Sequence, residues 1–297
     1  MPSRVTILLT CYNHLAHLKV ALESVWAQTY GDFEVLALDD GSSDGTREWL
    51  ADQTDPRLKL TFNEENLGTY ATLNVGIEQA KGEFLAILND DDVWAPDKLA
   101  RQLALMDSFD RIALVHTGGR FIDGDGAVMA DPAPMGFPFP RTSSGDVLAE
   151  LLEANKVCTS AALIRRSALD KVGPFDPSFY GMGDWHLWLR IAREFEVGYV
   201  DEPLTDYRVH AGNASRASES MLKDDLRIRE WIASWIDQRA EFKILAARNY
   251  AALAELRFRL GDSSGARQAA GEAVRRNPTR WQNYARWALT LKPGGRK

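Results

Sequence analysis

Three adjacent carboxylates, Asp90, Asp91 and Asp92, follow the apolar run at 84–88 after a single residue, Asn89. Adjacent carboxylates repel one another, so their proton affinities rise unless positive charge lies close by. The nearest basic residue in the sequence is Lys98. Mg²⁺ and Mn²⁺ bind hard oxygen ligands, often one or two carboxylates together with substrate phosphates. The run therefore leaves two alternatives, an ordinary solvated turn or the protein half of a divalent-cation site.

A second acidic stretch, DDGSSD at 39–44, follows another apolar run. Its carboxylates can accept hydrogen bonds from the N–H groups of a nucleobase or from ribose hydroxyls. They can also cap the helix that follows, and the two roles are compatible. Tyr12, just after the first apolar run, can stack on a base. These residue types are compatible with a nucleotide site, with a helix-capping turn, or with both.

The elements that position these residues alternate between strand and helix over the first hundred residues. The alternation implies βαβ units and a mostly parallel sheet, flanked by helices. In such sheets, ligands bind outside the carboxyl ends of the strands. We therefore expect the stretches 10–13, 39–44 and 89–92 to meet at one edge. Apolar and helical periodicities place the strands at 5–10, 33–38, 58–62 and 84–88, and the helices at 15–27, 46–50 and 70–81.

After Pro96 the pattern changes. The periodicity predicts a strand at 112–116 and a long loop at 123–146, which is typical of a functional lid and contains Met135, Phe137 and Phe139. The segment DGDGAVMAD lacks the acidic residue and the glycine that a calcium loop needs, so we reject a calcium site there. Further helices are expected at 98–108, 146–153, 166–172 and 185–193.

From residue 218 onward the chain is expected to be nearly all helix. The spacing of Ala254, Gly261-Asp262, Ala266 and Ala273 resembles one tetratricopeptide-type helical hairpin. A single such unit cannot bury its own face. We favour a helical cap over a peptide-binding array. The sequence thus predicts two domains, a catalytic domain at 1–217 and a helical region at 218–297.

The composition describes an ordinary globular protein of 297 residues, 45% hydrophobic and 26% charged. No apolar run approaches the roughly 18 residues that suggest a membrane span. The first residues read as a strand rather than a signal peptide. Cys11 and Cys158 are too few for a disulfide framework or a zinc site. We infer a cytoplasmic location.

The net charge of −7 hides an asymmetry between two parts of the chain. Residues 240–297 carry 12 Lys and Arg against 4 Asp and Glu, which leaves 23 against 38 in the rest. One interpretation is a set of solvated helix faces. The other is a basic tail that lies near anionic lipid head groups or an acidic partner. The second would put the protein at the inner face of the membrane.

Four ordered blocks together resemble the family-2 glycosyltransferases. They are VTILLTCYN, ALESVWAQTYGDFEVLALDDGSSDGT, NEENLGTYATLNVGIEQAKGEFLAILNDDDVWAPDKL and GMGDWHLWLRIA. The resemblance covers roughly 4–214. It implies an inverting enzyme that uses nucleotide sugars on the GT-A fold, a Rossmann-like α/β fold, here with an all-helical C-terminal extension. It does not specify the sugar or the acceptor.

The resemblance also implies roles by position. Thr10 and Tyr12 match residues that line the nucleotide pocket. Asp40 matches the carboxylate that binds the base, and Asp39 lies beside it. Asn66 joins the expected nucleotide-sugar contacts.

The run 89–92 occupies the place of the family's DxD motif. Its first acidic position is Asn89 here, and its second is Asp91. The resemblance therefore implies Asp91 as ligand of Mn²⁺ or Mg²⁺, with Asp90 and Asn89 on the nucleotide side and Asp92 mostly structural. His210 in YRVHAGNAS matches a family histidine near the metal, and imidazole suits a Mn²⁺ site. His14, His17, His116 and His186 show no ligand spacing.

Asp184 matches the family's catalytic base, although GDWHLWLRIA also reads as a helix N-cap before an apolar stripe. A carboxylate must take the acceptor's hydroxyl proton as the new bond forms. The expected partners are a nucleoside-diphosphate sugar, a UDP-sugar first among them, and a glycan, lipid-linked or protein acceptor, with no nucleic acid. Assembly of surface polysaccharide, lipopolysaccharide or glycoprotein glycans is the expected context.

Three rival functions fit the sequence less well. A nucleotidyltransferase would need a glycine-rich, basic loop after the first strand, which residues 10–13 do not supply. A phosphohydrolase would need further ligand clusters. A non-catalytic relative that binds a nucleotide, or a partner through the helical tail, is the alternative; the presence of Asp184 argues against it.

Overall fold

The computed structural model describes residues 2–130, 138–213 and 218–279. The chain divides into two compact units, the first formed by Met1–Leu148 and Asn155–Asn213, the second by Ala149–Ala154 and Ala214–Lys297. The sequence-based division after residue 217 stays a proposal. The segment Ala149–Ala154, which the sequence assigns to the catalytic domain, clusters with the second unit.

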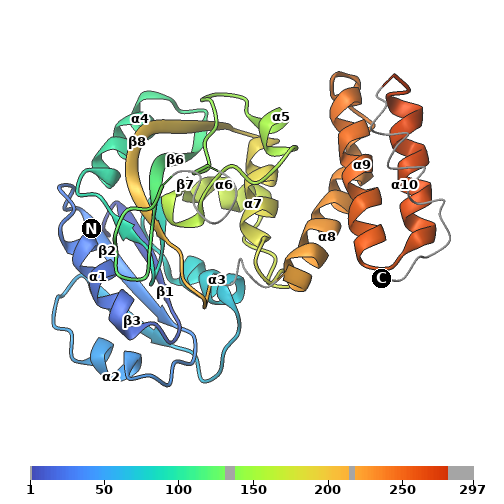
Figure 1. The fold of residues 1–297 in the computed structure, drawn as a ribbon. Helices are drawn as coiled ribbons and strands as arrows, with labels where there is room; N and C mark the ends of the chain where they lie inside the picture. The colour runs from blue at the N-terminus through green and yellow to red at the C-terminus, as the bar shows by residue number, and fades with distance from the viewer. Residues whose placement is uncertain (1, 131–137, 214–217, 280–297) are drawn as a thin grey trace. The chain divides into compact units, whose positions relative to one another are not determined.

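The first unit is built on one eight-stranded sheet with the order β3-β2-β1-β4-β7-β6-β8-β5 (Figure 1). Neighbours among β3, β2, β1 and β4 are parallel, β7 is antiparallel to both β4 and β6, and β8 is parallel to β6. The strands are β1 (Val5–Cys11), β2 (Phe33–Asp39), β3 (Leu58–Phe62), β4 (Phe84–Asn89), β5 (Val93–Trp94), β6 (Ile112–Ile122), β7 (Leu163–Arg165) and β8 (Glu196–Arg208).

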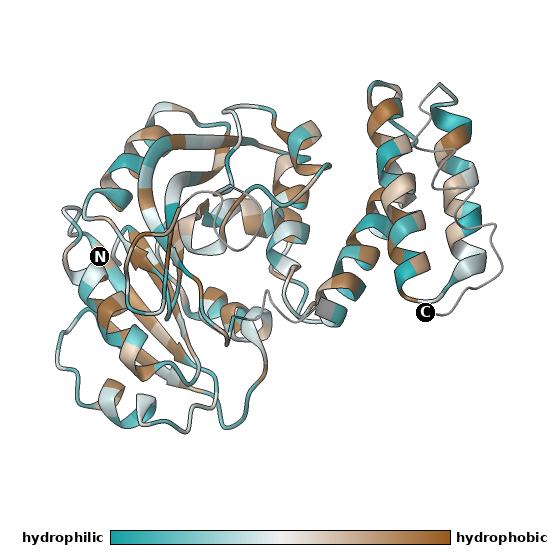
Figure 2. Cartoon of the chain, viewed as in Figure 1, coloured by the Kyte–Doolittle hydropathy of each residue, from teal (hydrophilic) through white to brown (hydrophobic). Residues whose placement is uncertain are grey.

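The parallel half forms because its central strands are almost entirely apolar. β1 reads VTILLTC and β2 reads FEVLALD, and nearly every residue of both is buried. Strands buried on both faces need such continuous runs rather than alternation. Figure 2 shows these strands mostly in the hydrophobic colours. The strands thus provide a rigid base for the loops at their ends.

Helices cover the sheet (Figure 1). α3 packs on β1 and β2, and α4 packs on β6 and β8. Helical periodicity places apolar residues on the buried side, as in α1, where Leu18, Leu22 and Val25 are buried. The helices of the first unit are α1 (Leu15–Trp26), α2 (Thr46–Ala51), α3 (Thr69–Gln79), α4 (Lys98–Ser108), α6 (Arg166–Val172) and α7 (Gly183–Ala192); a 3₁₀ turn, η1, spans Thr159–Ala161 and the short α5 spans Leu148–Leu151.

The strand register brings the predicted site segments to one edge. Cys11 is level with Asp39 on β2, and Thr10 is level with Asn89 on β4. The residues after these positions therefore emerge side by side at the carboxyl end of the sheet. This confirms the predicted mostly parallel α/β fold.

The strands and helices predicted from the sequence agree less well with the structure after residue 110. The strand predicted at 112–116 continues to Ile122, and β8 was not predicted. β8 contains Pro203, which lies where the β6–β8 register shifts, and a proline with three acidic neighbours obscures a strand pattern. The helix predicted at 146–153 is reduced to α5. Met135 and Phe137 of the predicted lid lie outside the described residues, whereas Phe139 packs with Phe121 and Val209.

The second unit is helical, as predicted. It contains α8 (Ser218–Ile236), the turn η3 (Ala240–Phe242), α9 (Lys243–Arg259) and α10 (Ser263–Arg276). Asp262 caps α10 by accepting a hydrogen bond from the Gly265 N–H at 2.8 Å. Small residues let α9 and α10 pack closely through Ala254, Ala269 and Ala270. Within the described ranges, every helix is too short or too polar to cross a membrane.

Candidate functional site

Asp90 lies directly after β4 and is tied to the loop that follows β1. Its carboxylate accepts a hydrogen bond from the Tyr12 N–H at 2.7 Å and lies 3.0 Å from Nδ1 of His14. The side chain of Asp90 is only 8% exposed. Burial raises the pKa of Asp90 to about 6, against the opposing effect of the His14 hydrogen bond. The nucleotide contact predicted for Asp90 stays a prediction.

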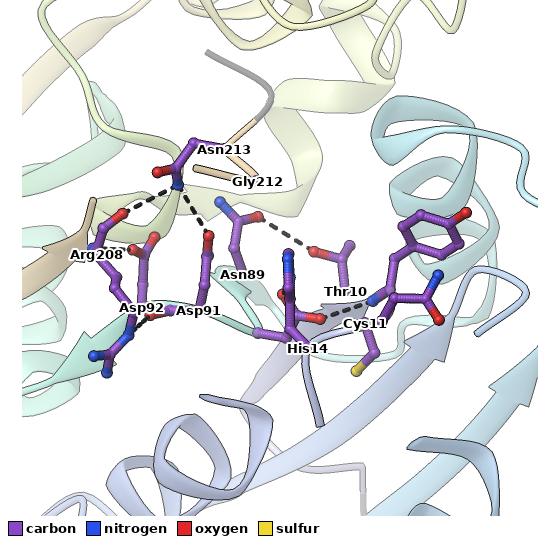
Figure 3. Close-up of polar contacts among 12 residues, drawn as sticks. Thr10, Cys11, His14, Asn89, Asp91, Asp92, Arg208, Gly212 and Asn213 are labelled. Carbon is purple, nitrogen blue, oxygen red and sulfur yellow. Dashed lines mark hydrogen bonds and ion pairs between the residues drawn. The ribbon is translucent and has the colours of Figure 1, made fainter. Parts of the chain in front are cut away.

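Asp91 points toward the loop after β8 and is the least buried of the three (Figure 3). Its Oδ2 lies 3.0 Å from Nε2 of His210 and accepts a hydrogen bond from Asn213 at 3.2 Å. The Oδ1 atom has no hydrogen bond to any residue that the structure describes. Asp91 therefore presents a free carboxylate oxygen next to an imidazole, as a cation ligand would.

Asp92 is fully buried and connects the end of β4 to η1 and to the end of β8. Its carboxylate accepts hydrogen bonds from the Ser160 hydroxyl and from the Arg208 N–H at 2.9 Å. Burial, and then the charge of Asp91, raise the pKa of Asp92 well above its usual range. An enclosed carboxyl with two protein donors has the features of a structural residue. The three aspartates are thus physically different groups.

The segment from Arg208 to Asn213 closes against the acidic run (Figure 3). The Arg208 guanidinium donates to the backbone oxygen of Asp91 at 2.8 Å and to those of Asp123 and Gly124. Asn213 donates to the Arg208 carbonyl as well as to Asp91. Because the guanidinium bonds to backbone oxygens, it fixes the loop without pairing with the carboxylates.

Three histidines gather beside Asp91. The ring centroids of His14 and His210 are 5.0 Å apart, and those of His17 and His210 are 5.4 Å apart. One ligand atom each from His14, Asp91 and His210 lies within 4.8 Å of the others. The sequence analysis set His14 and His17 aside because they show no ligand spacing. Their position at the start of α1, beside the carboxyl end of β1, brings them to the site.

Asp184 lies in the first turn of α7, and its side chain does not cap the helix; the N-cap is Met182. Its carboxylate accepts hydrogen bonds from Asn155 at 2.9 Å, Thr159 at 2.9 Å and the Trp185 N–H at 2.7 Å, with the Tyr70 hydroxyl at 3.4 Å. Burial raises the pKa of Asp184, and these hydrogen bonds lower it in part. A raised pKa makes a carboxylate a stronger base.

The glycine before Asp184 is required for packing. A Cβ at Gly183 would lie 2.8 Å from the ring of Tyr70, which is closer than real Cβ contacts. The start of α7 can therefore approach α3 closely enough for the Tyr70 hydroxyl to face Asp184. Gly183 thus permits the close packing of α7 against α3, and Asp184 supplies the carboxylate.

The turn η1 connects the two acidic centres. Thr159 donates to Asp184, and the next residue, Ser160, donates to Asp92. The Ser160 hydroxyl also accepts from the Asn89 N–H at 3.1 Å. Two adjacent residues of one turn thus fix the position of the Asp184 carboxylate relative to that of Asp92. Sequence reasoning missed Asn155, Thr159 and Ser160, because common polar residues in a loop give no signal on their own.

Asp40, the predicted base ligand, already has several protein donors. Its carboxylate accepts from Asn63 at 2.9 Å, from the Leu67 N–H at 2.8 Å and from the Gly68 N–H at 2.9 Å. These bonds fold the segment 63–68, which includes the exposed Asn66, against the end of β2. Any contact with a base would come in addition to this structural role.

Replacing Asp40 with Ala should lower the free energy of unfolding by about 2–3 kcal/mol, because three donors lose their acceptor and water replaces it only in part. Urea unfolding followed by circular dichroism measures the change. Asp52→Ala, an exposed position at the end of α2, is the matched control and should change stability by less than about 0.5 kcal/mol. Equal stability of the two variants would refute the structural role.

The remaining predicted residues lie at the same edge of the sheet. Asp39 is fully buried, and one of its oxygens accepts from Arg47 at 2.8 Å, which anchors α2. Thr10 donates to Asn89 at 3.2 Å across β1 and β4 (Figure 3). Tyr12 is 44% exposed, as stacking on a ligand requires. The edge therefore combines an exposed aromatic ring, amides, hydroxyls and a cluster of carboxylates with imidazoles.

The sequence has identifiable relatives. A model described as Glycosyl transferase family 2 matches residues 6–173. An uncharacterized glycosyltransferase from Nostoc sp. is 31% identical over 242 residues, which cover 76% of this chain and 72% of that protein. The Escherichia coli UDP-Glc:alpha-D-GlcNAc-diphosphoundecaprenol beta-1,3-glucosyltransferase WfgD is 28% identical over 197 residues, 66% of this chain and 73% of the relative.

Solved structures share the fold. Residues 1–349 of S. aureus TarS superpose with a TM-score of 0.68 at 17% identity, covering 97% of this chain and 88% of that chain. The mannosyltransferase PcManGT from Pyrobaculum calidifontis, solved in complex with GDP-Man and Mn²⁺, gives a TM-score of 0.59 at 20% identity, covering 98% and 81%. TarS has also been solved with UDP-GlcNAc, with a TM-score of 0.62 at 17% identity and coverage of 97% and 79%. These likenesses establish the GT-A fold.

Proposed function

Because the chain belongs to glycosyl transferase family 2, we propose that it transfers a sugar from a nucleoside-diphosphate sugar to a hydroxyl acceptor, with inversion at the anomeric carbon and with a divalent cation. The observation that carries this proposal is the pair of hydrogen bonds made by adjacent residues of the turn η1. Through Thr159 and Ser160 this turn ties a buried carboxylate, Asp184, to the acidic run beside β4. A base on one side and a diphosphate site on the other are what an inverting displacement needs.

The donor set beside β4 fits a divalent cation. Asp91 Oδ2 and His210 Nε2 are 3.0 Å apart, which is the separation of adjacent ligands that each lie about 2.1 Å from one ion. Carboxylate and imidazole together suit Mn²⁺, and carboxylate with phosphate oxygens suits Mg²⁺. When bound, such an ion supplies positive charge to the leaving diphosphate. Asp91 and His210 would hold it.

The nucleotide is proposed to lie along the edge formed by the ends of β1, β2 and β4. Tyr12 offers an exposed ring for the base, Asp40 and Asn66 belong to segments at the end of β2, and Thr10 and Asn89 are level with each other at the ends of β1 and β4. The UDP-GlcNAc complex of TarS and the UDP-Glc in the name of WfgD support a UDP-sugar as the first donor to test. The PcManGT complex supports GDP-sugars as the second.

Asp184 is the proposed catalytic base. The acceptor oxygen forms a bond to the anomeric carbon, its proton passes to an Asp184 oxygen, and the bond from that carbon to the diphosphate oxygen breaks with its electron pair on the diphosphate. Attack and departure on opposite faces invert the anomeric configuration. Asn155, Thr159 and the Trp185 N–H orient the carboxylate, and its raised pKa improves proton transfer.

The acceptor and the cellular context follow from relatives only. The name of WfgD describes transfer to a sugar on diphosphoundecaprenol. This supports a lipid-linked glycan acceptor and a role in surface polysaccharide assembly for the present chain. Such an acceptor would place the enzyme at the inner face of the membrane.

The basic C-terminal region is less available for lipid head groups than its charge suggests. Within the second unit, Arg248 pairs with Glu153, Arg257 with Glu230, and Arg276 with Asp237 and Glu272. Five of the 12 basic residues lie at 280–297, outside the described residues. A membrane contact through this region remains a prediction, and those five residues are the ones to test.

A donor screen tests the proposed function. Isothermal titration of the full chain with UDP, GDP and dTDP, each with Mn²⁺ and then with EDTA, should show one nucleotide that binds at micromolar concentration only when Mn²⁺ is present. The matching sugar nucleotide should then be hydrolysed slowly in the absence of acceptor. Equal binding in Mn²⁺ and EDTA would contradict the metal-dependent site, and binding without any turnover would favour the non-catalytic alternative.

A further inference from the structure

We propose that His14 is a third protein ligand of the cation site, beside Asp91 and His210, and that the two imidazoles make the site prefer Mn²⁺ and later first-row ions to Mg²⁺. The inference rests on the proposed function, because it concerns the ion that the sugar donor's diphosphate would share. It goes beyond that function by naming a further ligand and the choice of metal.

The backbone at His14 is fixed. His14 is the residue before α1, and its carbonyl oxygen accepts from the N–H groups of His17 and Leu18, both at 2.9 Å. The next residue, Leu15, donates its N–H to Asp44 at 2.9 Å. The side chain therefore starts from a rigid junction between the end of β1 and the first turn of α1. A ligand on such a junction loses little conformational entropy when it binds an ion.

The ring of His14 is oriented by a carboxylate. Its Nδ1 lies 3.0 Å from an Asp90 oxygen that is otherwise buried. With the proton on Nδ1, donated to Asp90, the lone pair of the neutral ring is on Nε2. A carboxylate that holds the far nitrogen of a histidine is a common arrangement around metal sites, and it raises the basicity of the coordinating nitrogen. Asp90 thus prepares His14 to bind an ion through Nε2.

The Nε2 of His14 faces the same small space as His210. A Cβ placed on Gly212 would lie 3.5 Å from His14 Nε2 and 3.2 Å from two atoms of the His210 ring. The ligand atoms of His14, Asp91 and His210 lie within 4.8 Å of one another. Opposite ligands of one ion are about 4.2 Å apart, so small side-chain rotations bring all three onto one ion.

The hydrogen bonds of the two rings differ in a way that makes His14 the readier ligand. The Gly212 N–H donates to Nδ1 of His210 at 3.1 Å, so a neutral His210 carries its proton on Nε2, facing Asp91. An ion on His210 must displace that proton and turn the Gly212 N–H away. His14 needs no such change when its ring is neutral with the proton on Nδ1, because Nε2 then carries the lone pair.

This donor set has a predictable metal preference. Mg²⁺ prefers an all-oxygen octahedron, whereas imidazole nitrogens suit Mn²⁺, Co²⁺ and Zn²⁺ increasingly well. A site with one carboxylate and no histidine would discriminate little between Mg²⁺ and Mn²⁺. Two nitrogens and one carboxylate should favour Mn²⁺, and Co²⁺ still more. His210 alone already gives the site one imidazole, so His14 as a second nitrogen ligand should strengthen the preference for Mn²⁺ and Co²⁺ over Mg²⁺.

His17 provides the matched control. It lies one turn further along the same helix, and its ring centroid is 6.2 Å from that of His14 and 5.4 Å from that of His210. It is not part of the group whose ligand atoms converge. Replacing His17 therefore removes a neighbouring imidazole without removing a ligand atom.

The test is metal binding to the full chain without nucleotide. Electron paramagnetic resonance of free aqueous Mn²⁺ gives the Mn²⁺ affinity, and competition gives those of Mg²⁺ and Co²⁺. We expect H14Q to weaken Mn²⁺ and Co²⁺ binding by about tenfold or more and Mg²⁺ binding by less than about threefold, with H17Q close to wild type. Spin-echo modulation from ¹⁴N on Mn²⁺ bound to the wild-type chain should show two coordinated imidazoles, and this measurement needs no variant.

The outcomes separate this inference from the proposed function. Equal affinities in H14Q and wild type, equal losses for Mn²⁺ and Mg²⁺, or a single ¹⁴N imidazole in the wild-type spectrum would overturn the role of His14. D91A losing cation binding in the same experiment would still support the cation site. If D91A binds Mn²⁺ as wild type does, the cation site itself is overturned, and with it the metal dependence of the proposed function.

Discussion

Replacing Asp184 with Asn should lower the transfer rate by about 10²- to 10⁴-fold while leaving nucleotide affinity within about threefold of wild type. The amide cannot take the acceptor proton, but it has nearly the shape of the carboxylate. With its oxygen in the place of Oδ2, the amide keeps the hydrogen bonds from Asn155 and Thr159, and only the Trp185 N–H loses its acceptor. Steady-state transfer with the donor identified by titration measures the rate, and calorimetry measures the affinity.

An exposed aspartate controls for the loss of one charge. Asp170→Asn, on the surface of α6, should leave both the rate and the affinity unchanged. Thermal unfolding of both variants shows whether they are folded. Normal turnover by Asp184→Asn would contradict the assignment of the base, and so would a loss of nucleotide binding equal to the loss of rate.

Replacing Asp91 with Ala should weaken the Mn²⁺-dependent binding of the nucleoside diphosphate by about 100-fold or more. Removing a metal ligand lowers the metal affinity at least as much as removing the groups that support that ligand. The residual affinity should equal that of the wild type in EDTA. The reason lies in the geometry: of the three adjacent aspartates, Asp91 is the most accessible and has an oxygen that forms no hydrogen bond to the described residues. Isothermal titration with and without Mn²⁺ measures both quantities.

Asp97→Ala serves as the control for Asp91→Ala. Asp97 lies five residues after Asp92, is exposed, and accepts a hydrogen bond from the Thr29 hydroxyl at 2.9 Å. Its replacement should leave metal-dependent binding intact. If Asp91→Ala titrates like Asp97→Ala, the cation is not held at the end of β4.

The parallel half of the sheet could be predicted from the sequence because its strands are short, apolar and separated by helices of clear periodicity. The rule that the carboxyl ends of parallel strands share one edge then placed Thr10, Asp39 and Asn89 together, and the register confirms this. The run at 90–92 could also be located. Its division into three different environments could not, because those depend on contacts with residues 68 to 122 positions away.

The contacts of His14, Thr159 and Ser160 could not be predicted from the sequence for a related reason. His14 makes its contacts with Asp90 and the neighbourhood of Gly212, and Thr159 and Ser160 make theirs with α7 and β4. Single polar residues at large sequence separations carry no local pattern. β8, the strand that ends at Arg208 and leads to His210, was not predicted, because Pro203 and the register shifts interrupt its strand pattern. Only the folded chain shows these residues as one arrangement.

The stereochemistry of turnover tests the central claim most directly. Proton NMR can follow hydrolysis of the α-linked sugar nucleotide that the chain binds, in Mn²⁺ and without acceptor, before mutarotation equalises the anomers. If Asp184 activates a hydroxyl opposite the diphosphate, the β-anomer of the free sugar must appear first, and Asp184→Asn must abolish its formation. First appearance of the α-anomer, or an unchanged rate in Asp184→Asn, would contradict inverting transfer at this site.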